Sequence, residues 1–181
     1  MPTKLIKAFD LYVMSPKIAI AVSGGLDSMV LMNLAKISKK IKPKNIHIIV
    51  IDHNLRKGSK EEALFVKEEA SKLGLRSVIL TWKGKRPSSK IQATARKERY
   101  NLLFDYCKEN QISDLFIGHH LDDQIENFIF RMFRGAGIVG LTSFSNFSKR
   151  DGINLIRPLI AVSYTHLRAH ETKAKLGLPV V

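Results

Sequence analysis

Four short apolar segments, separated by longer amphipathic ones, restrict the fold of this chain more than any other feature. Their starts lie 28, 32 and 37 residues apart, and the segments are Ile18–Val22, Ile46–Ile51, Val78–Trp82 and Leu115–Gly118. Between them, apolar residues recur at spacings of three and four in Asp27–Lys40, Glu61–Leu73 and Gln92–Lys108. Buried apolar strands that alternate with amphipathic helices are typical of a parallel sheet covered on both faces. The pattern therefore predicts an α/β fold with a doubly wound parallel sheet and helices on both faces.

Two further elements are expected towards the C-terminal end. A fifth helix is predicted at Asp122–Arg134, directly after the fourth strand, because apolar residues again recur at helical spacing. Ile153–Ile160 is predicted to be a last strand or an extended segment broken by Pro158. Ser59 and Glu62 have the spacing of a capping box, which would begin the second helix.

The length of 181 residues fits one domain, which we expect to occupy residues 1–161. Residues 162–181 are interpreted as a tail of doubtful origin, because Ser163–Thr172 lacks apolar periodicity and resembles a translated cloning or sequencing junction. His166 and His170 in this tail are interpreted as surface histidines, since no third metal ligand accompanies them.

The charge of the chain points to a polyanionic partner. Lysine and arginine total 30 against 16 acidic residues, a net charge of +14, which suggests nucleic acid or an anionic membrane face. No apolar run approaches the ~20 residues of a spanning helix, so insertion into a membrane is excluded. The basic segment Lys83–Arg99 has seven basic residues and one acid, whereas Tyr100–Phe130 has six carboxylates and one lysine. Carboxylates are thus expected beside a positive surface.

Cysteine content indicates the compartment. The single Cys107 excludes a disulfide framework, a CxxC redox pair and a cysteine-based zinc or iron–sulfur site built within this chain. Residues 1–16 contain Lys4, Lys7 and Asp10 and have no clean apolar core of a secretory signal. A reducing cytoplasm is therefore the expected location.

The strongest chemical signal lies between the first strand and the first predicted helix. It is the string Ser23-Gly24-Gly25-Leu26-Asp27-Ser28. Two glycines let a backbone come close to an anion, two hydroxyls add donors, and a helix N-terminus attracts negative charge. A carboxylate such as Asp27 would share a phosphate site if Mg²⁺ lay between them. The alternative is an ordinary Gly-Gly turn in which Asp27 and Ser28 cap the helix.

This string and five later ones resemble the PP-loop, or N-type ATP pyrophosphatase, family, and within it the tRNA(Ile)-lysidine synthases. The string at residues 23–28 resembles the pyrophosphate-binding loop. The later matching strings are Asp52–Arg56 (DHNLR), Gln92–Tyr100 (QATARKERY), Gly118–Glu126 (GHHLDDQIE), Arg134–Leu141 (RGAGIVGL) and Arg157–Leu159 (RPL). The resemblance extends from about Lys17 to Ile160, and it implies a Rossmann-like fold of the adenine nucleotide alpha hydrolase type.

The resemblance implies a ligase that uses ATP and Mg²⁺ on the isoleucine tRNA with a CAU anticodon. ATP would adenylate the C2 oxygen of the wobble cytidine, and the ε-amine of free lysine would then replace AMP to give lysidine. Adenylation is chemically sensible, because the oxygen on cytosine C2 is a poor leaving group until it is esterified.

The resemblance also implies site residues. The catalytic ones would be Asp27, which also holds Mg²⁺, and the paired Asp123 and Glu126. Those implied to bind ATP are Ser23, Gly24, Gly25, Leu26, Asp27, Ser28, Asp52, His53, Arg56, Arg96, Gly118 and His119. Those implied to bind lysine or tRNA are His120, Asp123, Glu126, Arg99, Arg131 and Arg134.

Simpler interpretations stand beside several of these roles. Acids at a helix N-terminus can merely complement its dipole, and Arg96 with Arg99 can form a solvated basic helix face. His119 and His120 could ligate a metal, although polar contacts to nucleotide or tRNA are preferred. Trp82 could stack on a base, but a buried core position is favoured.

The chain also departs from the family pattern. In the family, an acid, a Ser/Thr-Asn pair and further arginines follow the RPL string, and C-terminal domains grip the tRNA; this chain stops before them. We therefore expect a truncated catalytic core. The alternatives are a non-catalytic nucleotide- or RNA-binding remnant, a 2-thiocytidine synthase, which its lone Cys107 disfavours, and a small-molecule ATP pyrophosphatase, which the positive charge disfavours.

Overall fold

The computed structural model describes residues 2–52, 58–82, 84, 91–118 and 146–159. Its elements, in chain order, are α1 (Pro2–Asp10), β1 (Ile18–Ala21), α2 (Leu26–Ile37), the 3₁₀ turn η1 (Pro43–Asn45), β2 (Ile46–Asp52), α3 (Ser59–Lys72), β3 (Arg76–Thr81), α4 (Ile91–Glu109), β4 (Asp114–Ile117), β5 (Phe147–Arg150) and β6 (Ile153–Ile156). The four predicted strands and the three helices between them are confirmed to within a few residues.

The strands form one six-stranded sheet in the order β3-β2-β1-β4-β6-β5. The first five of these are parallel, and β5 pairs antiparallel with β6 at the edge. Successive connections run outward from β1 to β2 and β3, and the chain then crosses back to place β4 on the other side of β1. In open parallel sheets a crevice forms outside the carboxyl ends of the strands where the order reverses in this way. Here that point lies between β1 and β4.

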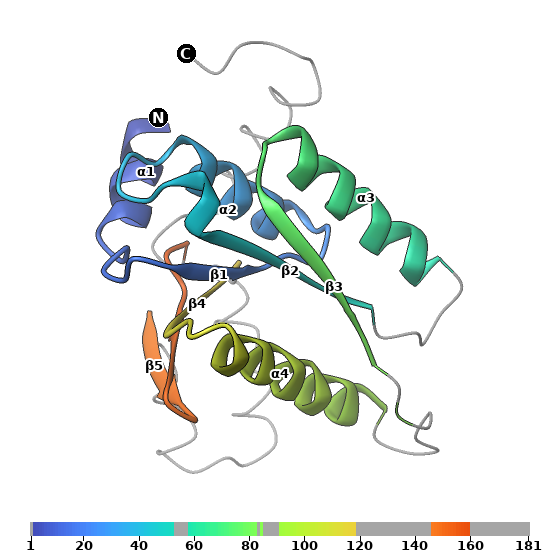
Figure 1. Cartoon of the computed structure of the whole chain (residues 1–181). Coiled ribbons are helices and arrows are strands. Elements are labelled where there is room, and N and C mark those ends of the chain that lie inside the picture. Colours follow the sequence, from blue (N-terminus) through green and yellow to red (C-terminus); the bar gives the residue numbers. More distant parts are fainter. Residues whose placement is uncertain (1, 53–57, 83, 85–90, 119–145, 160–181) are drawn as a thin grey trace, which may run out of the picture.

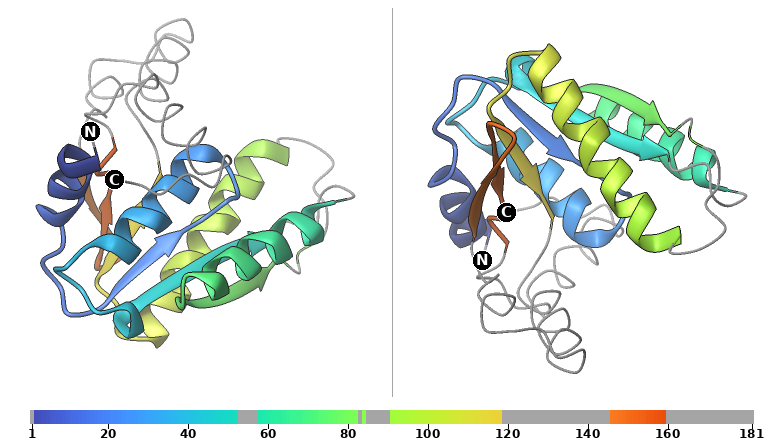
Figure 2. Two further views of the ribbon diagram at one scale, coloured as in Figure 1. Left: turned by 90° about the horizontal axis from the view of Figure 1, so that it is seen from above. Right: turned by 90° about the horizontal axis from the view of Figure 1, so that it is seen from below.

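Helices cover both faces of the sheet, as the apolar strands predict. In Figure 1 α1, α2 and α3 lie on one face and α4 lies on the other, and the two views of Figure 2 agree. Alternate residues of β1 enter different cores: Ile18 and Ile20 pack with α1, α2 and α3, whereas Ala19 packs with Leu103 and Phe104 of α4. The period-two alternation of a strand therefore joins two apolar layers through one sheet.

Two elements were missed by the sequence analysis. Helix α1 is nine residues long, and of its described residues only the apolar Leu5 and Phe9 are buried, with Lys7 between them. A hydrogen bond links the ends of α1 and α2: the hydroxyl of Ser38, the C-cap residue of α2, donates to Oδ1 of Asp10 at 2.5 Å. Strand β5 contains Phe147 as its sole apolar residue, because it is an exposed edge strand with no second neighbour. Short elements of this kind carry too little apolar pattern to be recognised.

The expected capping box at the start of α3 is wrong. Gly58 is the N-cap residue, with a positive φ of 95°, and it makes no side-chain hydrogen bond to the helix end. The Ser59 hydroxyl instead donates to Asp52 Oδ1 at 2.7 Å. The acceptor is a buried carboxylate at the end of β2, and a buried charged group is costly unless it is hydrogen-bonded.

The structure confirms two further predictions, and two others fall on residues that it does not describe. Ile153–Ile156 is a strand, as predicted for the start of the Ile153–Ile160 segment, and Trp82 is buried, which agrees with the core interpretation. The helix predicted at 122–134 and the tail at 162–181 lie outside the described residues. Within the described part of the chain, no helix has the length and apolarity needed to cross a membrane.

The sealed core on the α4 face gives a direct test of the fold. Cys107 is 0% exposed, and burial raises the pKa of its thiol to about 12. At pH 8 roughly one thiol in ten thousand would then be ionised, and only the thiolate is reactive. We expect a thiol-specific chromogenic reagent to label the native protein very slowly and the urea-unfolded protein at once. Rapid stoichiometric labelling without denaturant would contradict this packing.

Candidate functional site

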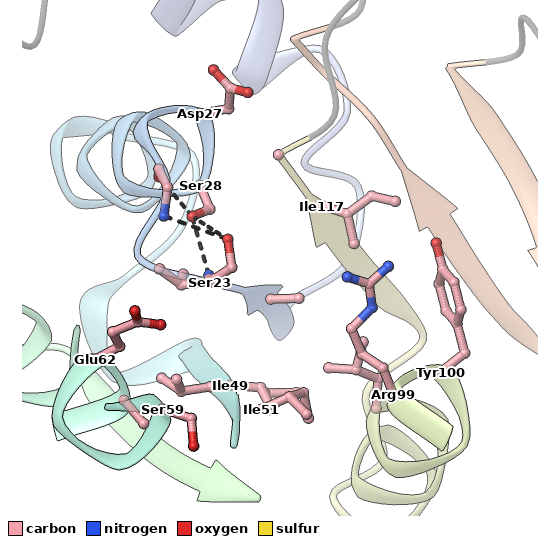
Figure 3. Close-up of a pocket in the computed structure, with 17 residues that line it drawn as sticks. Ser23, Asp27, Ser28, Ile49, Ile51, Ser59, Glu62, Arg99, Tyr100 and Ile117 are labelled. Atoms are coloured by element: carbon pink, nitrogen blue, oxygen red, sulfur yellow. Dashed lines mark hydrogen bonds between the residues drawn. The ribbon is translucent and has the colours of Figure 1, made fainter. Parts of the chain in front are cut away.

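A pocket of about 560 Å³ opens at the carboxyl ends of β1, β2 and β4 (Figure 3). This is the point at which the strand order reverses. Its lining comes from the loop after β1, the starts of α2 and α3, and the middle of α4. The lining residues are Ala21, Val22, Ser23, Gly25, Asp27, Ser28, Ile49, Val50, Ile51, Ser59, Glu62, Ala63, Arg99, Tyr100, Leu103, Ile117 and Gly118.

One wall of the pocket is the loop of residues 23–28, which leads from β1 into α2. Gly24 has a φ of 84°, a left-handed conformation that favours glycine, and it reverses the chain direction. Gly25 has an ordinary φ of −71°, and among the described residues a Cβ added there would meet only the Ser23 hydroxyl, at 3.5 Å. Folding alone therefore does not require glycine at position 25. Its missing side chain leaves space on the pocket side of the loop.

The Ser28 hydroxyl holds this loop in shape. It donates to the carbonyl oxygen of Gly25 at 2.9 Å and accepts the N–H of Ser23 at 3.1 Å. The Ser23 and Ser28 hydroxyl oxygens are 3.3 Å apart. Because the single proton of Ser28 is used on the Gly25 carbonyl, Ser23 is the donor in the contact between the two hydroxyls, and its O–H would have to rotate to reach an anion. The donors that need no such rotation are the backbone N–H groups of the first turn of α2. Such N–H groups have no acceptor within their own helix.

Gly118 fixes the loop against the end of β4. A Cβ placed on Gly118 would lie 2.7 Å from the backbone nitrogen of Ser28 and 2.9 Å from the carbonyl carbon of Asp27. These are backbone atoms, so no side-chain rotation could relieve the overlap. The strand end and the N-terminus of α2 can therefore approach this closely only if residue 118 is glycine.

A second wall comes from α4. Arg99 and Tyr100 lie across the pocket from Ser23 and Glu62 (Figure 3). The guanidinium carbons of Arg96 and Arg99 lie 5.8 Å and 5.3 Å from the centre of the Tyr100 ring, within the range of cation–π contacts. Between the two walls, the floor is apolar and consists of Ala21, Ile49, Ile51, Leu103 and Ile117.

Two carboxylate side chains are among the residues that line the pocket, Asp27 and Glu62. In Figure 3 the Asp27 carboxylate is directed away from Ser23, and Glu62 reaches from α3 on the loop side. No group of three or more metal-ligating side chains occurs within the described ranges. Nucleotide-bound Mg²⁺ usually takes one or two carboxylates, with phosphates and water completing its shell. Because the Asp27 carboxylate is directed away from Ser23, it would have to turn towards the loop to bind such an ion there. Asp27 is the residue that would hold it beside the loop.

The structure brings several predicted site residues together and leaves others untested. Ser23, Gly25, Asp27, Ser28, Arg99 and Gly118 all line one pocket. Asp52 is buried at the end of β2, where Ser59 binds its carboxylate. The residues outside the described ranges are His53, Arg56, His119, His120, Asp123, Glu126, Arg131 and Arg134.

Sequence reasoning missed Ser59 and Glu62 as pocket residues and did not assign Tyr100 a role. Ser59 and Glu62 were interpreted as a helix cap, which explained them without a site. Their position just after a strand end was the available signal, because the carboxyl ends of parallel strands share one edge.

The contact at Gly118 can be tested by one added methyl group. We expect Gly118→Ala to lower the free energy of unfolding by about 1–3 kcal/mol, the usual cost of overpacking a tight contact. Urea denaturation measures this. The matched control is Gly25→Ser, which adds a side chain where there is space and keeps a favourable N-cap residue. A Gly118→Ala protein as stable as the wild type would show that the contact is looser than described.

Comparison with known proteins agrees with the geometry. The tRNA(Ile)-lysidine synthase of Orientia tsutsugamushi is 43% identical over 163 residues, covering 90% of this chain and 36% of that protein. The tRNA(Ile)-lysidine synthase of Bradyrhizobium diazoefficiens is 37% identical over 165 residues, covering 90% of this chain and 46% of the relative. The chain thus spans between a third and a half of the length of these curated relatives.

Solved structures show the same fold at low sequence identity. The U34-tRNA thiolase NcsA of Methanococcus maripaludis superposes with a TM-score of 0.78 at 16% identity, over 98% of this chain and 64% of that one. The NH3-dependent NAD synthetase of Campylobacter jejuni gives a TM-score of 0.59 at 16% identity, over 98% of this chain and 72% of that one. The family model of the PP-loop domain matches residues 2–178. By its sequence match and by the loop, sheet and pocket that it forms, the chain belongs to the PP-loop family.

Proposed function

We propose that this chain carries out the ATP-dependent joining of lysine to C2 of the wobble cytidine in CAU-anticodon tRNA(Ile). The products would be lysidine, AMP and pyrophosphate. The observation that carries this proposal is the glycine loop at residues 23–28, which forms one wall of an open pocket at the point where the strand order reverses. Support for the particular substrate comes from the relatives at 37% to 43% identity, which are tRNA(Ile)-lysidine synthases.

In this proposal the loop wall binds the polyphosphate of ATP. The Ser23 hydroxyl and the N–H groups at the start of α2 would donate to phosphate oxygens, and the helix dipole would favour their negative charge. Gly25 leaves space for this approach, since a Cβ there would occupy the pocket side of the loop. Mg²⁺ held by Asp27 would neutralise charge as pyrophosphate leaves. Asp52, His53, Arg56, Gly118 and His119 are proposed to contact ATP as well. Arg96, which the family resemblance also implies for ATP, lies over the Tyr100 ring across the pocket from the loop, and we propose it for the RNA instead.

The pocket is suited to hold a second substrate beside ATP. Its volume of about 560 Å³ lies within the range of small-molecule sites, which is roughly 300–1,000 Å³. The cytidine C2 oxygen would attack the α-phosphorus of ATP and pyrophosphate would leave. The lysine ε-amine would next attack C2, lose a proton and expel AMP. Positioning of these groups, more than covalent chemistry by the protein, would supply the rate enhancement.

The amine must lose a proton before or during its attack. We propose Asp123 and Glu126 for holding lysine and for accepting that proton, with His120, Arg99, Arg131 and Arg134 contacting lysine or tRNA. A cytoplasmic location is part of the same proposal. A cluster-dependent thiolation is not favoured, because these 181 residues contain one cysteine, which is buried and whose thiol pKa burial raises to about 12.

A charge placed in the loop should abolish ATP binding without unfolding the protein. Gly25→Asp keeps a preferred N-cap residue but sets a carboxylate against the phosphates. We expect the affinity for a non-hydrolysable ATP analogue to fall by at least tenfold in isothermal titration calorimetry, with little change in urea stability. The isosteric neutral comparison is Gly25→Asn, which should lose less affinity. Equal binding by wild type and Gly25→Asp would exclude the loop as the phosphate site.

The proposed reaction has its own test. The chain is incubated with ATP, Mg²⁺, lysine and CAU-anticodon tRNA(Ile), and lysidine is sought by nucleoside mass spectrometry. We expect lysidine from the wild type and a loss of more than a hundredfold in Asp27→Asn. Asp105→Asn, an exposed carboxylate change on α4, is the control and should retain activity. Binding of ATP and tRNA without product would instead support a non-catalytic binding remnant.

A further inference from the structure

Three arginines that lie far apart in the sequence meet around one tyrosine ring. Arg96 and Arg99 contact the Tyr100 ring from α4. Arg157, just after β6, lies close enough to Tyr100 and to Arg96 for both side chains to act electrostatically on its guanidinium. We call Arg96, Arg99, Tyr100 and Arg157 the arginine wall. The sequence indicates no role for Arg157 beyond its place in the string Arg157–Leu159.

Arg157 is held in place from several directions. Its backbone N–H donates to the carbonyl oxygen of Asn146 at 2.8 Å, and its Nη1 donates to the Ser148 hydroxyl at 3.2 Å. Tyr100 itself is 7% exposed and packs against Phe104, with ring centres 5.7 Å apart. Burial and the nearby Arg96 both lower the pKa of Arg157. A rigid, partly buried guanidinium loses little conformational freedom when a ligand binds to it.

Of the four residues of the wall, Arg99 and Tyr100 line the pocket, so the wall adds positive charge to that side of it. Among the residues that the structure describes, neither Arg96 nor Arg99 forms an ion pair. Like charges that are brought together repel one another, and a bound anion would relieve this repulsion. Guanidinium groups match phosphate oxygens in geometry and charge, so a phosphate is the fitting ligand.

We infer that the arginine wall binds a backbone phosphate of the RNA substrate beside the reacting nucleotide. This inference rests on the proposed function. The glycine loop, with its own donors, lies on the other side of the pocket from Arg99 and Tyr100 (Figure 3). A nucleoside that enters between the two walls brings its flanking phosphates to the rim, since both are covalently attached to its ribose. Arg157 is thereby a further RNA-binding residue, and Tyr100 is the residue that positions it.

The test uses the whole chain and an anticodon stem-loop RNA with a CAU anticodon. Binding is measured by fluorescence anisotropy at several salt concentrations. We expect Arg157→Gln to weaken RNA binding by roughly tenfold and to reduce the salt slope by about 0.7 to 0.9, the effect of one lost phosphate contact. Tyr100→Phe, which keeps the ring and removes the hydroxyl, should weaken RNA binding by a smaller factor. Affinity for the ATP analogue should change less than twofold in both.

Arg76→Gln is the matched control. Arg76 is exposed at the start of β3, at the opposite edge of the sheet, and its replacement removes the same single positive charge. If Arg157→Gln does not fold, RNA binding is measured instead on Arg157→Lys and Tyr100→Phe. RNA binding that falls no further than in Arg76→Gln would overturn the inference and leave the proposed function standing. A loss of ATP affinity with RNA affinity intact would also overturn it, since the phosphate would then be that of the nucleotide. If the wild type binds neither RNA nor ATP, the proposed function fails and the inference fails with it.

Discussion

The site depends on the close approach of two backbones, the end of β4 at Gly118 and the first turn of α2 at Asp27 and Ser28. A Cβ on residue 118 would overlap backbone atoms of both residues. The contact is possible because β1 and β4 are neighbours in the sheet and α2 begins directly above the end of β1. Gly24, with its φ of 84°, and the hydroxyl of Ser28 then set the path of the loop between them. The donors at the start of α2 are thus fixed before any ligand binds.

In our proposal the pocket combines two ways of binding phosphate, which differ in charge and in reach. Backbone N–H groups at a helix start are fixed and neutral, and they can surround a phosphate closely. The arginine wall carries full charges on longer side chains, held by the Tyr100 ring and the residues around β6. An arrangement with one kind of phosphate site on each side would bring a nucleotide and an RNA strand together over an apolar floor.

The sequence predicted the parts of this fold whose cause is local and periodic. The apolar runs of β1 to β4 predicted the strands because both faces of a parallel sheet are buried, and the loop that was singled out by its glycines lines the pocket. Strand β5 escaped notice because an exposed edge needs no apolar pattern. The contact between Arg157 and Tyr100 was not predictable, because it depends on β6 being placed beside β4. At Ser59 a local pattern was present but misleading. The spacing of Ser59 and Glu62 predicted a capping box, whereas the Ser59 hydroxyl donates to the buried carboxylate of Asp52.

A crystal structure of the chain with a non-hydrolysable ATP analogue and Mg²⁺ tests the central claim most directly. Our account predicts phosphate oxygens within hydrogen-bond distance of the Ser23 hydroxyl and of the N–H groups that begin α2, next to Gly118, with the arginine wall left for the RNA. Phosphates bound to Arg96, Arg99 and Arg157, with the loop of residues 23–28 making no contact to the nucleotide, would contradict it.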